Sequence, residues 1–209
     1  MTTQPTPSPR GSYPKGQARR QQIVDAALAV FARGGFHSGS LREIAKRVEL
    51  TPAGLMHHFA TKEELFTEVL RQRDERVRAA AGDVSETTLL EQTRNVVAYN
   101  QSTRGLTSLY TIVAAEATDT EHPAHRYFVD RYAESRELAE ATLRDALAHG
   151  RVRADLDVPL AARLIPAVMD GLQQQWLLDD SFDMVAAFDE FLRGYFRPPA
   201  TTQGTPATA

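Results

Sequence analysis

The sequence predicts an all-α protein. Apolar residues recur at intervals of three and four through most of the chain, as they do on the buried face of a helix. Gly and Pro stand mainly between these segments, and no alternation of apolar and polar residues is long enough to predict a strand. With 209 residues, 42% of them hydrophobic and 24% charged, the chain is long enough to bury a sizeable core.

Both ends of the chain are expected to be disordered, because they are rich in Pro, Ser and Thr and carry almost nothing that could pack. The N-terminal arm covers residues 1–16, and the C-terminal tail covers residues 198–209. The first helix follows the arm, from about residue 17 to residue 33, and the pair Gly34-Gly35 ends it.

Two short helices are expected next. Ser40 with Glu43 three residues later has the pattern of a capping box for the first. Thr51 caps the second, and Pro52 occupies its first helical position, where a missing N–H does no harm. Two short helices behind a longer one are typical of a helix-turn-helix head, which the sequence places at residues 17–62.

Residues 63–197 are expected to form a helical body. Its first helix opens at a second capping pair, Thr61 with Glu64, and runs from Lys62 to about Ala81. Five more helical patterns follow, at about residues 88–102, 106–118, 123–149, 158–179 and 183–196.

The charges are divided unevenly between the head and the body. Residues 1–62 carry nine Lys and Arg against three Asp and Glu, a net charge of +6, whereas the rest of the chain carries −9. This division fits a head that binds phosphates on a body that does not. A solvated, charged surface fits it equally well.

Several classes of protein are excluded by what the sequence lacks. It has no Cys, so it has no disulfide, thiolate zinc site or cysteine nucleophile. No phosphate-binding glycine loop, nucleophile elbow or Glu-x-x-His pair is present, so we expect no catalysis and no cofactor. His122 and His125 flank a helix start at Pro123, and we expect no metal there. No apolar run is long enough to span a membrane and no secretory signal is present, so a cytoplasmic protein is expected.

Between Gln22 and Leu70 the chain resembles the TetR-type transcriptional regulators. The resemblance rests on four strings that recur in order: Ile23 with Ala26-Ala27, Phe31 and Gly35-Phe36; Leu41-Arg42-Glu43-Ile44-Ala45; Thr51-Pro52-Ala53-Gly54-Leu55-Met56-His57-His58-Phe59; and Thr61-Lys62-Glu63-Glu64-Leu65. The third string is a variant of the family's recognition helix, with Met56 where Tyr is frequent. Glu49 stands in the turn where Gly is common, and a non-Gly residue in the left-handed conformation costs on the order of 1 kcal/mol.

The resemblance implies that the head binds double-stranded DNA. Phosphate contacts are expected from Ser40, Arg42, Thr51, His57 and Lys62, and close approach to bases from Pro52, Ala53, Gly54 and Met56. The basic residues from Lys15 to Arg20 are expected to add contacts from the arm. For Lys62, a solvated position in the first turn of its helix is an alternative.

A weaker resemblance continues into the body, through Glu116-Ala117, His122–His125 and the run Met169–Leu178. It implies an internal pocket for an unknown small-molecule effector and a homodimer formed by the last two helices. Candidate pocket residues are Tyr99, Tyr110, His125, Phe128, Tyr132, Gln174 and Trp176, and candidate interface residues are Leu164, Val168, Leu172, Phe188 and Phe191. Both sets are also compatible with the ordinary core of one chain.

The function expected from the resemblance is that of a ligand-responsive repressor, which a small molecule releases from a palindromic operator. One alternative is a helical protein that binds a small molecule and whose head does not bind DNA specifically. Another is a DNA-binding protein with little preference for sequence, which would bind all duplexes alike.

Overall fold

The computed structural model describes residues 13–83 and 88–197. These residues are helical with no strands, as the sequence predicts. The helices are, in order, α1 (Tyr13–Ser38), α2 (Leu41–Arg47), α3 (Pro52–Met56), α4 (Lys62–Ala81), α5 (Leu89–Ser102), α6 (Arg104–Glu116), α7 (His125–Ala148), α8 (Val158–Leu178) and α9 (Met184–Phe196).

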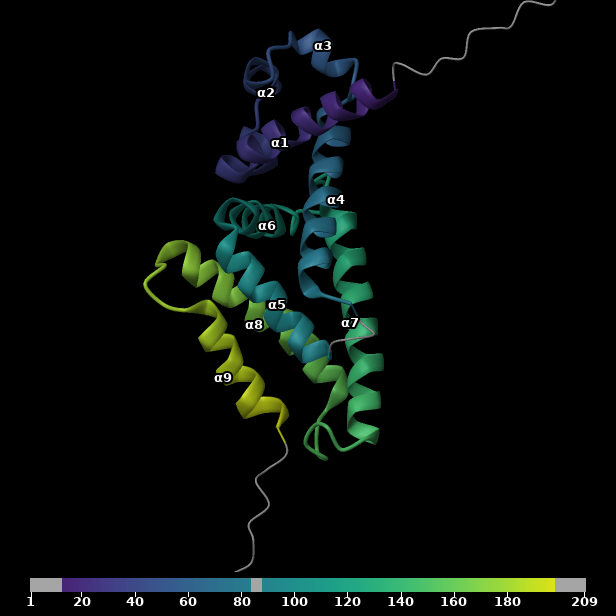
Figure 1. Ribbon diagram of the computed structural model, residues 1–209, viewed down its shortest axis with the longest axis vertical. Coiled ribbons are helices and arrows are strands. Elements are labelled where there is room, and N and C mark those ends of the chain that lie inside the picture. The colour runs from purple at the N-terminus through teal and green to yellow at the C-terminus, as the bar shows by residue number, and fades with distance from the viewer. Residues whose placement is uncertain (1–12, 84–87, 198–209) are drawn as a thin grey trace, which may run out of the picture.

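The helices form a small head on a longer body (Figure 1). Helices α1, α2 and α3 make the head, and α4 leads from the head into the body beside α7. Helix α6 lies across the end of the body directly below α1, and α5, α8 and α9 fill the remainder. The head therefore rests on α6 and on the upper part of α4.

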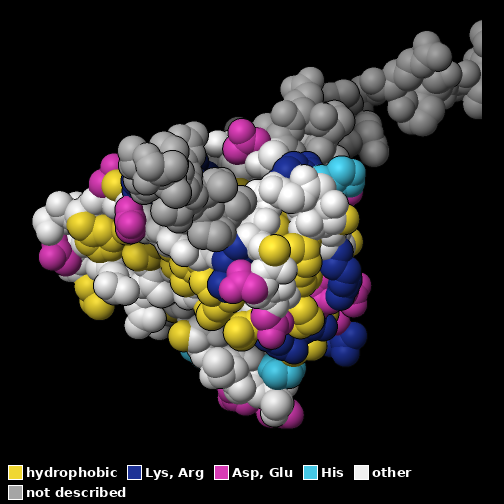
Figure 2. Space-filling view, turned by 90° about the horizontal axis from the view of Figure 1, so that it is seen from below, with side chains coloured by type: hydrophobic (Ala, Val, Ile, Leu, Met, Phe, Trp, Pro, Cys, Tyr) yellow, Lys and Arg dark blue, Asp and Glu magenta, His cyan; other side chains and the backbone are white. Residues whose placement is uncertain are grey.

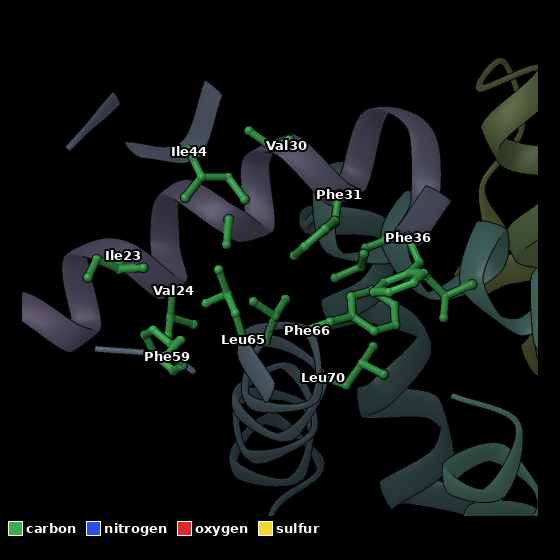
Figure 3. Packing of buried hydrophobic residues seen from close by; sticks show 14 of the residues in the cluster. Ile23, Val24, Val30, Phe31, Phe36, Ile44, Phe59, Leu65, Phe66 and Leu70 are labelled. Carbon is green, nitrogen blue, oxygen red and sulfur yellow. The ribbon is translucent and has the colours of Figure 1, made fainter. Parts of the chain in front are cut away.

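One apolar core joins the head to the upper body. Figure 3 shows side chains of α1, α2 and α4 meeting in it, and the labelled residues are Ile23, Val24, Val30, Phe31, Phe36, Ile44, Phe59, Leu65, Phe66 and Leu70. The same core includes Leu109 of α6 and Phe128 of α7. Apolar side chains therefore pack continuously across the junction between α6 and α1.

A second core holds the lower body together. It is built from α5, α7, α8 and α9, with Val97, Leu143, Ile165, Trp176 and Phe188 among its buried members. Trp176 and Phe188 were candidates for the pocket and the dimer interface, respectively. Phe188 is fully buried inside the single chain, so it packs in the core and is not available to a partner.

The predicted caps stand at the start of α2, α3 and α4. Thr51 Oγ1 accepts a hydrogen bond from Gly54 N at 3.0 Å, and Thr61 Oγ1 accepts one from Glu64 N at 3.0 Å. Ser40 caps α2 as expected, but the rest of its capping box does not form. The carboxylate of Glu43 bonds the guanidinium groups of Arg33 and Arg47, because two cations are better partners for it than a backbone N–H.

The N-terminal boundary differs from the expected one. Helix α1 begins at Tyr13, so residues 13–16 are helical and not part of a disordered arm. Residues 1–12 and 198–209, the rest of the expected arm and the expected tail, lie outside the described residues. At Gly34 and Gly35 the backbone leaves helical geometry, as expected, although one helical turn follows up to Ser38. No helix in the described part of the chain has the length and apolar character to cross a bilayer.

Candidate nucleic-acid interface and ligand cavity

Helix α3 presents a face that is free of core residues. Leu55 is fully buried and anchors the helix, whereas Pro52, Ala53 and Met56 are exposed, Met56 by 38%. The exposed side chains are small at the N-terminal end, so the backbone there is able to approach another molecule closely. The exposed cap Thr51 marks the positive end of the helix, which favours an anion such as a phosphate.

Helix α2 carries the basic side chains of the head. Ile44 and Ala45 bury its inner face, and Arg42 and Lys46 are exposed on its outer face. Within the described part of the chain, Arg42 and Lys46 have no ion-pair partner. Their charge is therefore free for a polyanion. Ser40, the exposed cap of α2, completes this surface.

The turn between α2 and α3 contains the strained residue that the sequence indicated. Glu49 has φ = +54°, the left-handed conformation, and is the one non-Gly residue with positive φ in the described part of the chain. Leu50 N, directly after it, returns to Ala45 O at 2.9 Å and closes the turn. The turn thus holds a non-Gly residue in the left-handed conformation, at a cost of about 1 kcal/mol.

Arg19 and Arg20 do not belong to a free basic arm, which corrects the expectation for this part of the chain. The guanidinium of Arg19 donates to Val48 O at the C-terminal end of α2, and that of Arg20 donates to His58 O just after α3. Arg20 also lies over the Phe59 ring, 4.0 Å from its centroid. Unpaired carbonyls at helix ends are good acceptors for arginine, so these two residues brace the helix-turn-helix pair.

Lys62 has contacts within the chain that the sequence did not predict. Its ammonium donates to His37 O at 3.3 Å and lies 4.5 Å from the centroid of the Phe36 ring. Partial burial lowers the pKa of Lys62, with Glu63 and Glu116 acting in the opposite direction. The structure thus places this cation against the last turn of α1, where it supports the junction with the body.

Glu116 forms the junction between the head and the body. Its carboxylate accepts a hydrogen bond from Phe36 N at 2.9 Å, and Ser108 Oγ donates to Ala32 O at 2.9 Å. The Nε2 atom of His122, a buried residue, lies 3.4 Å from the same carboxylate. Burial is the main cause that lowers the pKa of His122, so its neutral form is favoured. Two positions of α6 are therefore tied to backbone atoms of α1.

A cavity of about 160 Å³ lies inside the body. Helices α4, α5, α6, α7 and α8 all contribute to its wall. Of the seven expected pocket residues, Tyr110 and Tyr132 line it, and their hydroxyl groups are 3.3 Å apart. Tyr132 OH also donates to Asp170 of α8 at 2.5 Å.

The other five expected pocket residues are not among those that line this cavity. Phe128 and Trp176 belong to the two apolar cores, and Gln174 is exposed. His125 Nδ1 is 2.9 Å from Ala117 O, beside the start of α7. Tyr99 is half-buried and is not among the lining residues.

Three buried polar residues of the cavity escaped the sequence analysis: Arg73, Asn100 and Gln173. For Arg73 and Gln173, the position within the helical pattern of the sequence could have revealed burial. Arg73 lies three residues after Leu70 and four before Val77, and Gln173 lies three residues before Trp176, each on the apolar face of its helix. A polar residue on an apolar face indicates either a buried network or a ligand site.

The remaining interface candidates lie along α8 and α9. Leu164, Val168, Leu172 and Phe191 are half-buried in the single chain. Their neighbours on α8 include large exposed apolar residues, Leu160 at 49% and Leu178 at 84%. Figure 2 looks at the end of the body away from the head and shows hydrophobic side chains exposed among acidic and basic ones. Among the residues that the structure describes, no cluster of three His, Asp or Glu is placed to hold a metal ion.

Two family models match the chain. Residues 23–69 match the model of bacterial regulatory proteins of the TetR family, and residues 86–197 match the C-terminal domain of BetI-type transcriptional repressors. Together the two models cover the head and the body.

Individual relatives agree with this assignment. The transcriptional regulator UidR of Escherichia coli is 26% identical over 153 residues, which cover 72% of this chain and 78% of UidR. The transcriptional repressor KstR2 of Rhodococcus jostii is 27% identical over 176 residues, covering 77% of this chain and 80% of KstR2.

Solved structures show the same fold. A putative regulator from Saccharomonospora viridis in complex with choline has a TM-score of 0.72 at 22% identity, over 86% of this chain and 98% of that one. FadR from Bacillus subtilis in complex with stearoyl-CoA has a TM-score of 0.68 at 20% identity, over 83% of this chain and 95% of that one.

Proposed function

Because the chain belongs to the TetR family of bacterial regulatory proteins, we propose that it is a homodimeric repressor of transcription. Its two heads would bind the half-sites of a palindromic operator, about one helical turn of DNA apart. A small molecule in the body would release it. The repressor KstR2 and the BetI-type repressor model, which match this chain, support the direction of regulation.

The exposed face of α3 is the observation that carries the DNA-binding part of the proposal. Thr51 opens this face, and Pro52, Ala53 and Gly54 add almost no side chain to it. Such a helix is able to enter the major groove, which is about 12 Å wide. Arg42 and Lys46 on α2 would meet the flanking phosphates.

The exposed apolar side chains of α8 support the dimer. Leu160 and Leu178 lie eighteen residues apart, which is five turns of one helix, and the half-buried Leu164 and Val168 lie between them. Pairing of this face with its copy would cover residues that are otherwise in contact with water. We expect the wild-type protein to sediment as a dimer and Val168→Glu to sediment as a monomer. Leu138→Glu, at an exposed position of α7, is the control and should leave the dimer intact.

Release by a ligand would act through α6. Tyr110 of this helix lines the cavity, while Ser108 and Glu116 of the same helix bond the backbone of α1. A ligand that displaces Tyr110 would move both contacts, and with them the head. Dimeric heads that no longer match the half-site spacing bind the operator less tightly.

The phosphate contacts are testable on a duplex of arbitrary sequence. The affinity of wild-type protein should fall steeply with salt concentration, and Arg42→Ala should reduce the slope of log K against log salt by about 1. Arg126→Ala removes an exposed arginine of α7 and should leave the slope unchanged. Equal slopes for wild type and Arg42→Ala would contradict the proposed surface.

The alternative, a helical protein whose head does not bind DNA specifically, rests on Glu49 and Met56. Glu49 adds a negative charge and strain to the turn, and Met56 replaces a side chain able to hydrogen-bond a base. This alternative function would be favoured if the wild-type protein bound every duplex only weakly and the single substitution Glu49→Gly restored tight binding.

A further inference from the structure

The cavity in the body contains polar groups that have no partner within the described part of the chain. They are Nε of Arg73, Oδ1 and Nδ2 of Asn100, and Oε1 of Gln173. The three residues are 1–2% exposed and all line the cavity. A buried polar atom without a hydrogen bond costs about 1–3 kcal/mol, so four of them around one space indicate a site for a polar ligand.

Positively charged side chains outnumber acidic ones among the residues that line the cavity. Arg73 Nη1 bonds Asp74 Oδ1 at 3.1 Å, and Arg131 Nη1 bonds Asp74 Oδ2 at 2.6 Å, so two guanidinium groups share one carboxylate. Asp170 also lines the cavity and accepts from Tyr132, and burial is the main cause that raises its pKa. Among the described residues that line the cavity, two arginines therefore face one carboxylic acid, Asp170.

The ring of Tyr110, one of the two tyrosines that line the cavity, is not free to hold an organic cation. Choline and similar ligands bind against open aromatic faces. The ring of Tyr110 already lies against guanidinium groups, with Arg73 at 4.2 Å and Arg131 at 5.4 Å from its centroid. A cationic ligand would have to approach these two cations, and repulsion would oppose its binding.

The entrance to the cavity also carries positively charged side chains. An open hollow of about 300 Å³ adjoins the cavity and shares Tyr132, Pro166 and Asp170 with it. Arg136 and Arg163 line this hollow. The Tyr132–Asp170 hydrogen bond stands between the two spaces, and the arginines on the outer side would attract an anion. The larger surface hollow beside α9 has exposed arginines but none of the unpartnered buried polar atoms.

We infer that the effector is a small carboxylate that also carries a hydrogen-bond donor. Its carboxylate would accept from Arg73 Nε and the Asn100 amide, and its donor would reach Gln173 Oε1 or Asn100 Oδ1. A volume of about 160 Å³ is close to that of a cavity that holds benzene, so the ligand has about six to ten non-hydrogen atoms. This inference rests on the proposed function, which requires an effector, and it excludes both choline and a long acyl-CoA.

The test is a thermal-shift measurement on the full-length protein without DNA. The probes are lactate, pyruvate, benzoate and 4-hydroxybenzoate, their four neutral amides, and the cations choline and benzylamine. We expect lactate or 4-hydroxybenzoate, the carboxylates that carry a hydroxyl donor, to raise the melting temperature more than pyruvate or benzoate, which lack one. The amide of the acid that binds should bind at least about tenfold more weakly. A shift with a cation or an amide but with no carboxylate would overturn the inference, and so would the absence of a shift with every probe.

Variants locate the binding in the cavity. Asn100→Leu removes two unpartnered polar atoms at similar volume, so the free protein should melt at the same or a higher temperature while the carboxylate shift disappears. Arg73→Met should also abolish the shift, and Asp74 would keep Arg131 as its partner. Gln173→Leu should weaken carboxylate binding, whereas Gln174→Leu, the exposed neighbour, should not. A carboxylate shift that survives in Asn100→Leu would contradict the site.

The DNA assay distinguishes failure of this inference from failure of the proposed function. Salt-dependent binding that weakens in Arg42→Ala, combined with no response to carboxylates, would leave the regulator intact and reject only the ligand class. A carboxylate shift in a protein that binds no duplex would support the cavity and reject the DNA-binding proposal.

Discussion

Glu116 of α6 holds the backbone of Phe36 in the last turn of α1, through a carboxylate oxygen 2.9 Å from Phe36 N. Eighty residues of sequence separate the two groups. The same helix supplies Tyr110 to the cavity, so α6 is in contact with the ligand site at one position and with the head at another. In the proposed function, a signal from the cavity would have a short physical route to the proposed DNA-binding surface.

Removal of this carboxylate should weaken the junction. Glu116→Ala leaves Phe36 N without its partner, and the free energy of unfolding should fall by about 1–3 kcal/mol, measured by urea denaturation. If α6 carries the signal, the variant should also show a smaller effect of the effector on DNA affinity. Glu121→Ala, at an exposed position nearby, should change stability by less than about 0.5 kcal/mol. Equal stability of the two variants would contradict the role of Glu116.

Gly35 should tolerate no side chain. Its φ of +68° with ψ of −162° lies in a region that is essentially restricted to Gly. A Cβ there would also be 2.2 Å from an oxygen of Glu116. Gly35→Ala should therefore lower the melting temperature and weaken DNA binding. In Gly105→Ala, where a Cβ meets nothing within 4 Å, neither effect is expected.

Glu49, the strained residue in the turn between α2 and α3, is a position where a substitution should increase stability. Glu49→Gly should raise the free energy of unfolding by up to about 1 kcal/mol, because Gly adopts positive φ without steric conflict. Glu49→Ala removes the same charge and keeps the strain, so it should not stabilise the protein. Denaturation of the two variants side by side separates strain from charge, and equal stabilisation would assign the effect to charge.

Arg20 should behave as a structural residue. It donates to His58 O and lies over Phe59, so Arg20→Ala should lower the free energy of unfolding by about 1–3 kcal/mol. Arg42→Ala should leave stability nearly unchanged and act on DNA binding instead. If Arg20→Ala weakened DNA binding and left stability nearly unchanged, Arg20 would again be interpreted as part of a DNA-binding arm.

His122 should make the protein less stable in mild acid. Burial lowers its pKa in the folded state, Glu116 and Asp119 act against this effect, and His37 reinforces it. The unfolded chain then binds a proton more readily than the folded one, so stability should fall as the pH drops below the ordinary histidine value of about 6.5. His122→Asn keeps an acceptor for Ala124 N and should flatten this part of the pH profile. Identical slopes for the two proteins between pH 7 and pH 5 would contradict the assignment.

The sequence predicts the head in most detail because its information there is local. Caps such as Thr51 and Thr61 act within four residues, and the structure has them as expected. The left-handed turn at Glu49 was also indicated by the sequence. The contacts of Arg19, Arg20 and Lys62 within the chain were not predicted, because their partners are backbone carbonyls 25 to 38 residues away, which no local pattern reveals.

The cavity was less predictable for the same reason. Its wall combines five helices, and only their packing decides that Gln173 points inward while Gln174 points to solvent. Aromatic residues were reasonable candidates, yet Phe128 and Trp176 fill the cores. The unpartnered polar atoms become visible only once their neighbours are known.

Selection of duplexes from a random pool by the wild-type protein, at about 150 mM salt, tests the central claim most directly. Non-specific phosphate binding is weak under these conditions, so only specific binding enriches a sequence. The proposed function predicts recovery of a palindrome with half-sites about one helical turn apart, which Arg42→Ala should bind more weakly but with the same sequence preference. Recovery of no sequence above background would contradict it and would leave the cavity as the place to look for function.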